Sequence, residues 1–160
     1  KEIPGHEWEI PQLEDFQEYK PINMVVSECM QTDFTTVMEE DIIELVAEMM
    51  DWKNTNFTPV ENKEGNLVGL VTTKDIMRSL IKKKNAPSLE NITVKDVMVK
   101  DPITIGPEAN IIDAMKILQK NKIGSIPVVS GNELVGVISD DMFIDITSRL
   151  MERLKKLNSA

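Results

Sequence analysis

The stretch Leu67-Val-Gly-Leu-Val-Thr-Thr-Lys-Asp75 decides the fold, because it returns later in the chain as Leu134-Val-Gly-Val-Ile-Ser-Asp-Asp-Met142. In each copy, an apolar run of strand length leads directly into a polar segment that can start a helix. A second apolar run, Phe57-Thr-Pro-Val60 or Ser125-Ile-Pro-Val-Val129, precedes it across a turn rich in Gly and Asn. Two such runs around a turn predict a β-hairpin. The sequence therefore contains an internal repeat.

The repeat extends to the N-terminal side of each hairpin. Val26-Ser-Glu-Cys-Met30 aligns with Val94-Lys-Asp-Val-Met98, and each is followed by a β-prone run, at Thr35–Val37 and Ile103–Ile105. The apolar residues that come next have the spacing of a helix with one buried face. They are Ile42, Ile43, Val46, Met49 and Met50 in the first copy, and Ile111, Ile112, Met115 and Leu118 in the second.

Each copy therefore predicts the order β-α-β-β-α, with closing helices over about 73–83 and 140–157. A unit of about 55 residues buries too little surface to be comfortably stable alone, so we expect the two copies to pack sheet against sheet. We divide the chain into four parts. These are an acidic linker or arm (1–23), a first repeat (24–84), a connector (85–92) and a second repeat with a long C-terminal helix (93–160).

Composition excludes several classes of protein. The 160 residues include 18 Lys and Arg against 27 Asp and Glu, a net charge of −9, which argues against binding to nucleic acid or anionic membranes. No apolar run approaches the ~18 residues that span a bilayer, and no signal peptide is evident, so we expect a cytoplasmic protein. Because the chain lacks an initial methionine, we expect a fragment of a longer protein.

The sequence offers no catalytic centre. Cys29 and His6 are the only residues of their kinds, so one chain can form neither a disulfide nor a four-residue zinc site of the usual Cys and His ligands. We find no nucleophile with a neighbouring base, no Gly-rich phosphate loop and no cluster of metal ligands. The sequence therefore predicts that the chain is not an enzyme and holds no metal and no catalytic cofactor.

Thr72 and Asp75 stand where the strand of the first copy turns into a helix. A Thr with an acid three residues later is the pattern of a capping box. The same junction leaves backbone N–H groups free for a phosphate, and a carboxylate can accept both hydroxyls of a ribose. Both interpretations remain open at this point.

Together these motifs resemble the tandem CBS-domain pair, or Bateman module, over about residues 24–157. The resemblance rests on Val-x-Asp-Val-Met at 94–98, Ile-Pro-Val-Val at 126–129 and Gly-Leu-Val-Thr-Thr-Lys-Asp at 69–75. It implies an α+β fold with two pseudo-twofold-related repeats. It also implies a regulatory unit that binds AMP, ADP, ATP or S-adenosylmethionine between the repeats and modulates an attached or partner enzyme.

A second resemblance concerns the possible partner. Four segments that follow the acidic arm are similar to the CBS pairs appended to carboxylate-amine ligases of the glutamate-cysteine ligase type. They are Met30-Gln-Thr-Asp-Phe34, Met50-Asp-Trp52, Pro59-Val-Glu-Asn62 and Leu67-Val-Gly-Leu-Val71. It implies that such a ligase is the fused enzyme.

The family resemblance also assigns a ligand site. It implies that Thr72 binds phosphate, that Asp75 binds ribose, and that Lys74 and Lys122 are either phosphate ligands or solvated lysines. The second repeat would hold the adenine. Its implied contributions are Ile103, Thr104, Ile123, Gly124, Ser125, Ile126 and Pro127.

The second copy departs from the pattern because Met142 stands where the ribose-binding Asp belongs. A thioether is only a weak acceptor for a diol. Asp140 or Asp141 could replace the missing acid only if the helix began later. We therefore expect one strong site per chain and a weaker second one, built from Thr36, Asn56, Phe57, Thr58 and Ser139. A structural dimerisation module with decayed sites is the alternative.

A homodimer is also predicted. Ile146, Leu150, Leu154 and Leu157 form an apolar stripe along the last helix, longer than its own hairpin needs. The alternative is that the stripe folds back on its own chain or holds the arm through Trp8. We expect Trp52, at the end of the first helix, to pack against the body.

Overall fold

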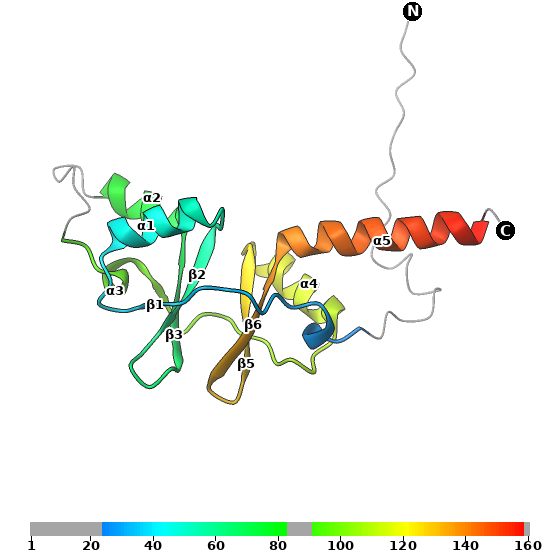
Figure 1. Cartoon of the computed structure of the whole chain (residues 1–160), viewed down its shortest axis with the longest axis horizontal. Coiled ribbons are helices and arrows are strands. Elements are labelled where there is room, and N and C mark those ends of the chain that lie inside the picture. The colour runs from blue at the N-terminus through cyan, green and yellow to red at the C-terminus, as the bar shows by residue number, and fades with distance from the viewer. Residues whose placement is uncertain (1–23, 83–90, 159–160) are drawn as a thin grey trace, which may run out of the picture.

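The computed structural model describes residues 24–82 and 91–158, which form two halves side by side (Figure 1). It is a mixed α+β fold with a repeated order of elements, as predicted. The first half contains β1 (Val37–Met38), α1 (Ile43–Trp52), β2 (Phe57–Glu61), β3 (Leu67–Thr72) and α2 (Thr73–Lys82). The rest of the chain forms α3 (Val94–Val97), β4 (Val99–Lys100), α4 (Ile111–Asn121), β5 (Ser125–Ser130), β6 (Glu133–Ser139) and α5 (Asp140–Asn158).

Both predicted hairpins are present. Strand β2 pairs with β3 and β5 with β6, both antiparallel, so Phe57 lies opposite Thr72 and Ser125 opposite Ser139. Each turn contains a glycine with positive φ, a conformation that costs a glycine little. The two hairpins also meet at their turn ends, where a bridge joins Asn66 to Glu133.

The short strand predicted at Ile103–Ile105 is reduced to a single parallel bridge between Ile105 and Val128. Instead, the unpredicted strand β4 pairs with β3 of the first half, which gives a four-stranded sheet in the order β1-β2-β3-β4. Strands β5 and β6 form a separate two-stranded sheet. The chain after α3 therefore adds an edge strand to the first sheet before it enters the second half.

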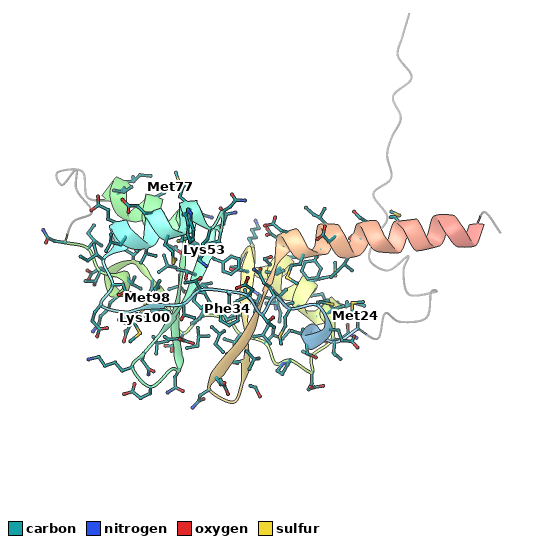
Figure 2. All side chains as sticks on the ribbon, viewed as in Figure 1. Met24, Phe34, Lys53, Met77, Met98 and Lys100 are labelled. Atoms are coloured by element: carbon teal, nitrogen blue, oxygen red, sulfur yellow. The ribbon has the colours of Figure 1, made fainter. Side chains whose placement is uncertain are left out.

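The two halves exchange short segments. Val26 is fully buried in the core of the second half, whereas Val94 and Met98 are buried in the core of the first. Figure 2 shows the same exchange, since Met98 lies in the first half and Met24 in the second. The exchange is symmetrical in its hydrogen bonds: the Val26 amide donates to Ala109 O and the Val94 amide to Asp41 O, both at 2.9 Å.

One glycine in each hairpin packs against a methionine of an exchanged segment. A Cβ added at Gly69 would overlap the Met98 side chain, and one added at Gly136 would overlap Met30. Each methionine therefore packs on the hairpin of the other repeat. This close approach explains why both copies of the opening motif have Gly at the third position, where a side chain would separate the halves.

Some expectations concern residues that are not described. The arm 1–23, most of the connector 85–92, and the side chains of Leu150, Leu154 and Leu157 lie outside the described residues. Trp52 is described, and the expectation that it packs is wrong: it is 82% exposed, with Lys53 Nζ 5.8 Å from the centre of its ring. In the part of the chain that is described, no helix is long and apolar enough to cross a membrane.

Candidate functional site

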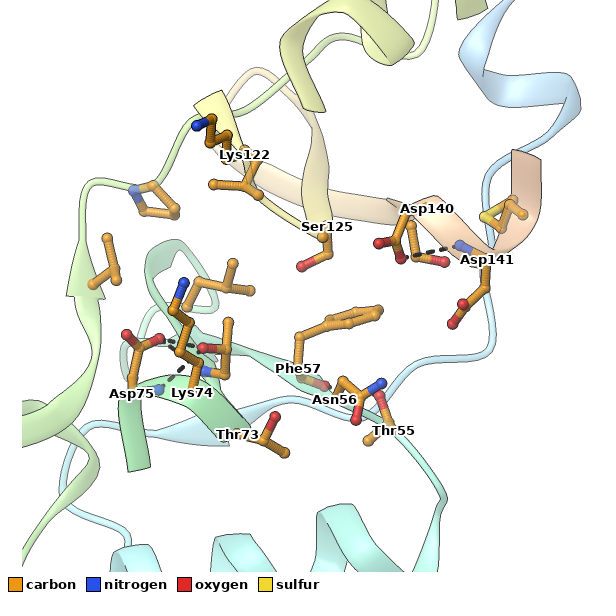
Figure 3. A pocket seen from close by; sticks show the side chains of 18 of the residues that line it. Thr55, Asn56, Phe57, Thr73, Lys74, Asp75, Lys122, Ser125, Asp140 and Asp141 are labelled. Carbon is orange, nitrogen blue, oxygen red and sulfur yellow. Dashed lines mark hydrogen bonds between the residues drawn. The ribbon is translucent and has the colours of Figure 1, made fainter. Parts of the chain in front are cut away.

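One cavity of about 760 Å³ lies between the two halves and is lined by residues of both (Figure 3). The two sites predicted from the sequence therefore open into the same space. Eleven of the predicted residues line it: Asn56, Phe57, Thr72, Lys74, Asp75, Ile103, Lys122, Ile123, Gly124, Ser125 and Ser139.

Five other predicted residues do not line this cavity. Ile126 and Pro127 are buried within β5, and Thr104 is exposed to solvent. The hydroxyl of Thr36 donates to Glu61 Oε2 at 3.0 Å. Thr58 donates to the Thr35 carbonyl at 2.8 Å and lines a smaller neighbouring cavity of about 180 Å³.

The first strand-to-helix junction forms the capping box that its sequence pattern suggests. The Thr72 hydroxyl donates to Asp75 Oδ2 at 2.5 Å, and the Thr72 amide donates to the same oxygen at 3.2 Å. In return, the Asp75 amide donates to the Thr72 hydroxyl at 3.2 Å. The other carboxylate oxygen, Oδ1, lies 3.8 Å from Nη1 of Arg78. Asp75 is thus held in one orientation while it lines the cavity.

The second junction has the same backbone and different side chains. Helix α5 begins at Asp140, so Met142 occupies the helical position that Asp75 has in α2, and no later start brings an acid there. The Asp140 amide donates to Gly124 O at 2.9 Å, as the Thr73 amide donates to Asn56 O at 3.0 Å. Met142 packs partly against the second core.

Two serines bring hydroxyls to the second half of the cavity. Ser125 and Ser139 are only 3% and 6% exposed, and they lie opposite each other across β5 and β6. Among the described residues, neither hydroxyl has a hydrogen-bond partner. Figure 3 shows the Ser125 hydroxyl directed into the cavity. These two groups are therefore available to a ligand, whereas the Thr72 hydroxyl is already engaged.

Charge is unevenly distributed around the cavity. Lys74 and Lys122 lie on the side of Asp75, and Asp140 and Asp141 lie on the opposite side (Figure 3). Arg78 joins the first group, since it contacts Asp75. An anionic group is therefore favoured near the first junction and disfavoured near the second.

The structure adds lining residues that the sequence analysis missed. The loop between α1 and β2 contributes Lys53, Asn54 and Thr55 beside the expected Asn56. A signal existed, because the first copy has an extra stretch here that the second copy handles with one residue fewer. No local pattern points to the others, which are Gln31, Leu70, Thr73, Arg78, Val99, Pro102, Asn121 and Asp145, whereas Asp140, Asp141 and Met142 line the cavity at the second junction that the repeat had already indicated.

Comparison with known families identifies both repeats. The CBS domain matches residues 26–82 and residues 94–148. Among curated relatives, an uncharacterised protein of Methanocaldococcus jannaschii is 31% identical over 125 residues, which is 78% of this chain and 43% of the relative. Inosine-5'-monophosphate dehydrogenase of Korarchaeum cryptofilum is 37% identical over 108 residues, 67% of this chain and 21% of the enzyme.

The chain thus spans less than half the length of these relatives. They give no support to the resemblance to carboxylate-amine ligases.

Solved structures share the fold. The CBS domain pair of protein MJ0100, in complex with 5'-methylthioadenosine and S-adenosyl-L-methionine, matches with a TM-score of 0.69 and 22% identity over 78% of this chain and 96% of that one. CBSX2 in complex with AMP matches with a TM-score of 0.67 and 21% identity over 79% of this chain and 98% of that one.

Proposed function

The chain belongs to the CBS-domain family, and we propose that it is a regulatory module that binds an adenosine-containing ligand in the cavity between its two repeats. The ligand would be AMP, ADP, ATP or S-adenosylmethionine. The module would act on an enzyme that is attached to it or associates with it, and would itself catalyse no reaction.

One observation carries the proposal: a single cavity combines Asp75 with apolar and backbone groups of the other repeat. Its volume of about 760 Å³ falls in the range of about 300–1,000 Å³ that is usual for small-molecule sites. Asp75 Oδ1 would accept from the ribose, while Ile103 and Ile123 would form apolar walls for the adenine. Lys74 would neutralise a phosphate.

The proposed mechanism is a shift between two arrangements of the halves. A ligand that contacts both repeats favours the arrangement in which both sets of contacts are made. Because each core contains a segment from the other repeat, a change in their relative orientation must move Met30 against Gly136 and Met98 against Gly69. Such a change would be transmitted to whatever precedes residue 24 or follows α5.

A thermal-shift panel tests the proposal. A ligand that binds only the folded state stabilises it by RT ln(1 + [L]/Kd), so at 100 times Kd it adds about 2.7 kcal/mol. We expect at least one of AMP, ADP, ATP, cyclic di-AMP and S-adenosylmethionine to raise the melting temperature, and GMP to raise it less. If no adenosine compound raises the melting temperature at millimolar concentration, the proposed function is wrong.

A structural dimerisation module remains a second candidate, and exposed apolar side chains favour it. On the outer sides of α1 and α2, Leu45 is 60% exposed, Met77 62% and Ile81 67%. Ile144 on α5 is 67% exposed, and α5 continues past the body of the second half (Figure 1). Exposed apolar surface of this kind commonly marks a contact with another chain.

Light scattering at tens of micromolar would detect the predicted homodimer as twice the 18.1 kDa of the chain. Leu150→Glu with Leu154→Glu tests the predicted stripe, and Leu45→Glu with Met77→Glu tests the exposed α1 and α2 side chains. The dimerisation module alone predicts a dimer with no response to the ligand panel. A monomer would exclude that candidate and leave the ligand-binding proposal in place.

A further inference from the structure

We propose that the end of the cavity at the second junction binds a cationic group of the ligand. The preferred ligand is then an adenosine whose 5' substituent carries a positive charge, as the sulfonium of S-adenosylmethionine does, and not AMP, ADP or ATP. The inference rests on the proposed adenosine site and narrows its ligand to one chemical class. It is carried by groups around Ser125 and Asp140, which lie apart from the ribose acceptor Asp75.

Two carboxylates at the start of α5 have no basic partner. Asp140 and Asp141 line the cavity, and among the described residues neither forms an ion pair. Asp140 Oδ1 accepts from the Asp141 amide at 3.0 Å, and Asp140 Oδ2 lies 3.5 Å from the place that a Cβ on Gly124 would take. The Asp140 carboxylate is thus held beside the Gly124 backbone at the cavity wall. Acids in a first helical turn also complement the helix dipole, so they do not identify a ligand by themselves.

A second, independent feature is a pair of buried hydroxyls at the same end of the cavity. Ser125 is 3% exposed, its hydroxyl is directed into the cavity (Figure 3), and it has no hydrogen-bond partner among the described residues. Ser139, which is 6% exposed, lies opposite it and is equally unpartnered in this part of the chain. Buried polar groups normally have partners, so these hydroxyls indicate a polar ligand group. The neighbouring carboxylates favour a positive charge on that group.

An aromatic ring adds a further attraction for a cation. Phe57 begins β2 in the first half and lines the cavity, and Figure 3 shows its ring on the same side as Asp140 and Asp141. The face of an aromatic ring attracts cations, and proteins bind quaternary ammonium groups in this way. In the described part of the chain, no group of three acidic, histidine or cysteine side chains is placed to hold a metal ion. The combination therefore favours an organic cation.

The 5' substituent is the part of the ligand that would reach this end. Asp75, Ile103 and Ile123 would hold the adenosine, and the same cavity extends from them to Asp140. A sulfonium on the 5' substituent would be attracted by the acids there, whereas a chain of phosphates would bring negative charge towards them. Because Asp140 and Asp141 are exposed, solvent and salt screen the attraction, and we expect it to change affinity by about tenfold.

Calorimetry with the full chain tests the charge directly. S-adenosylhomocysteine has the skeleton of S-adenosylmethionine but lacks one methyl group and, with it, the positive charge on sulfur. We expect wild-type protein to bind S-adenosylmethionine about tenfold more tightly than S-adenosylhomocysteine, and more tightly than AMP or ATP. Equal affinities for the two S-adenosyl compounds would overturn the inference without any variant.

Substitutions then locate the charge. Asp140→Asn combined with Asp141→Asn keeps the shape and removes two charges, so the preference for the sulfonium should fall below about threefold. Phe57→Leu keeps an apolar side chain without the ring and should weaken S-adenosylmethionine by about threefold and S-adenosylhomocysteine by less. Asp113→Asn is the matched control, because Asp113 also lies in the first turn of a helix but does not line the cavity. It should leave the preference unchanged.

The outcomes separate this inference from the proposed function. Tighter binding of AMP or ATP than of S-adenosylmethionine would refute the ligand class and leave the adenosine site in place. A preference for the sulfonium that survives both the double Asn variant and Phe57→Leu would show that the second junction does not bind the cation. If wild-type protein binds no adenosine compound, this inference and the proposed function both fail.

Discussion

The two strand-to-helix junctions of this molecule share a backbone and differ in chemistry. At the first, Thr72 and Asp75 form a closed pair that holds a carboxylate on the cavity wall. At the second, Ser139 has a free hydroxyl and Met142 turns partly into the core. The hydrogen bond from the first helical amide is nevertheless preserved at both. A repeat can therefore keep its backbone frame while only one copy keeps the acid of the proposed ligand site.

The largest effect that would test this difference is the loss of the acid. Asp75→Ala should weaken adenosine-ligand binding by about 2 kcal/mol, about thirtyfold, because charge-assisted hydrogen bonds to the ribose disappear. Met142→Ala at the equivalent position should change affinity by less than about twofold. Calorimetry on both variants, with circular dichroism to check folding, measures the contrast. Equal losses at the two junctions would mean that the ribose lies elsewhere.

The next effect concerns how the halves fit together. Gly136→Ala should lower the free energy of unfolding by about 1.5 kcal/mol, a typical cost of overpacking. The reason is that the added Cβ would overlap the Met30 side chain as far back as the Cβ of Met30. Gly69→Ala should cost less, since only the Met98 sulfur would lie within 3.0 Å of the added Cβ, whereas both Sδ and Cγ of Met30 would do so at Gly136. Urea denaturation compares them, with Gly106→Ala as the control because a Cβ there meets nothing within 4 Å. A larger cost at Gly69 would contradict this order.

The comparison can also be reversed by restoring the missing acid. Met142→Asp should create or strengthen a second site, by about tenfold for a bond to a charged group. Adenosine is the better probe, since the neighbouring Asp140 and Asp141 disfavour a phosphate. We expect the calorimetric stoichiometry to rise from one site per chain towards two. Two equivalent sites in the wild-type protein would show that Met142 is not the defect.

The smallest predicted effect concerns a difference between the two exchanged segments, which is the thiol of Cys29 in the first of them. Cys29 corresponds to Val97 in the repeat, and partial burial, with a smaller contribution from the Glu28 carboxylate, raises the pKa of the Cys29 thiol. A raised pKa means that the neutral thiol stabilises the fold fully below the pKa of the unfolded chain and that this contribution is lost as pH rises through the folded value. Cys29→Val should remove that alkaline loss while leaving stability at pH 7 nearly unchanged. Melting temperatures of both proteins at pH 7 and pH 10 test it, and identical pH profiles would contradict it.

Local elements were predictable because their signals are local. The predicted helix over 73–83 is observed as Thr73–Lys82, and the one over 140–157 as Asp140–Asn158, since both begin directly after a hairpin strand and have one apolar face. The capping box at Thr72 and Asp75 could likewise be predicted from two residue types at a spacing of three. The lack of an acid at position 142 could be predicted by aligning the two copies of the repeat.

What the sequence by itself determined is thus the repeat, the hairpins, the helix starts and the unequal junctions, all of which depend on neighbours within a few residues. Tertiary structure alone decided that Val26 and Val94 exchange cores, that the two expected sites become one cavity, and that Arg78 and Asp145 line it. Spacing along the chain fixes which face of an element is apolar, but not which of two similar cores that face enters. That choice follows from the summed burial of distant side chains, which no short stretch of sequence records.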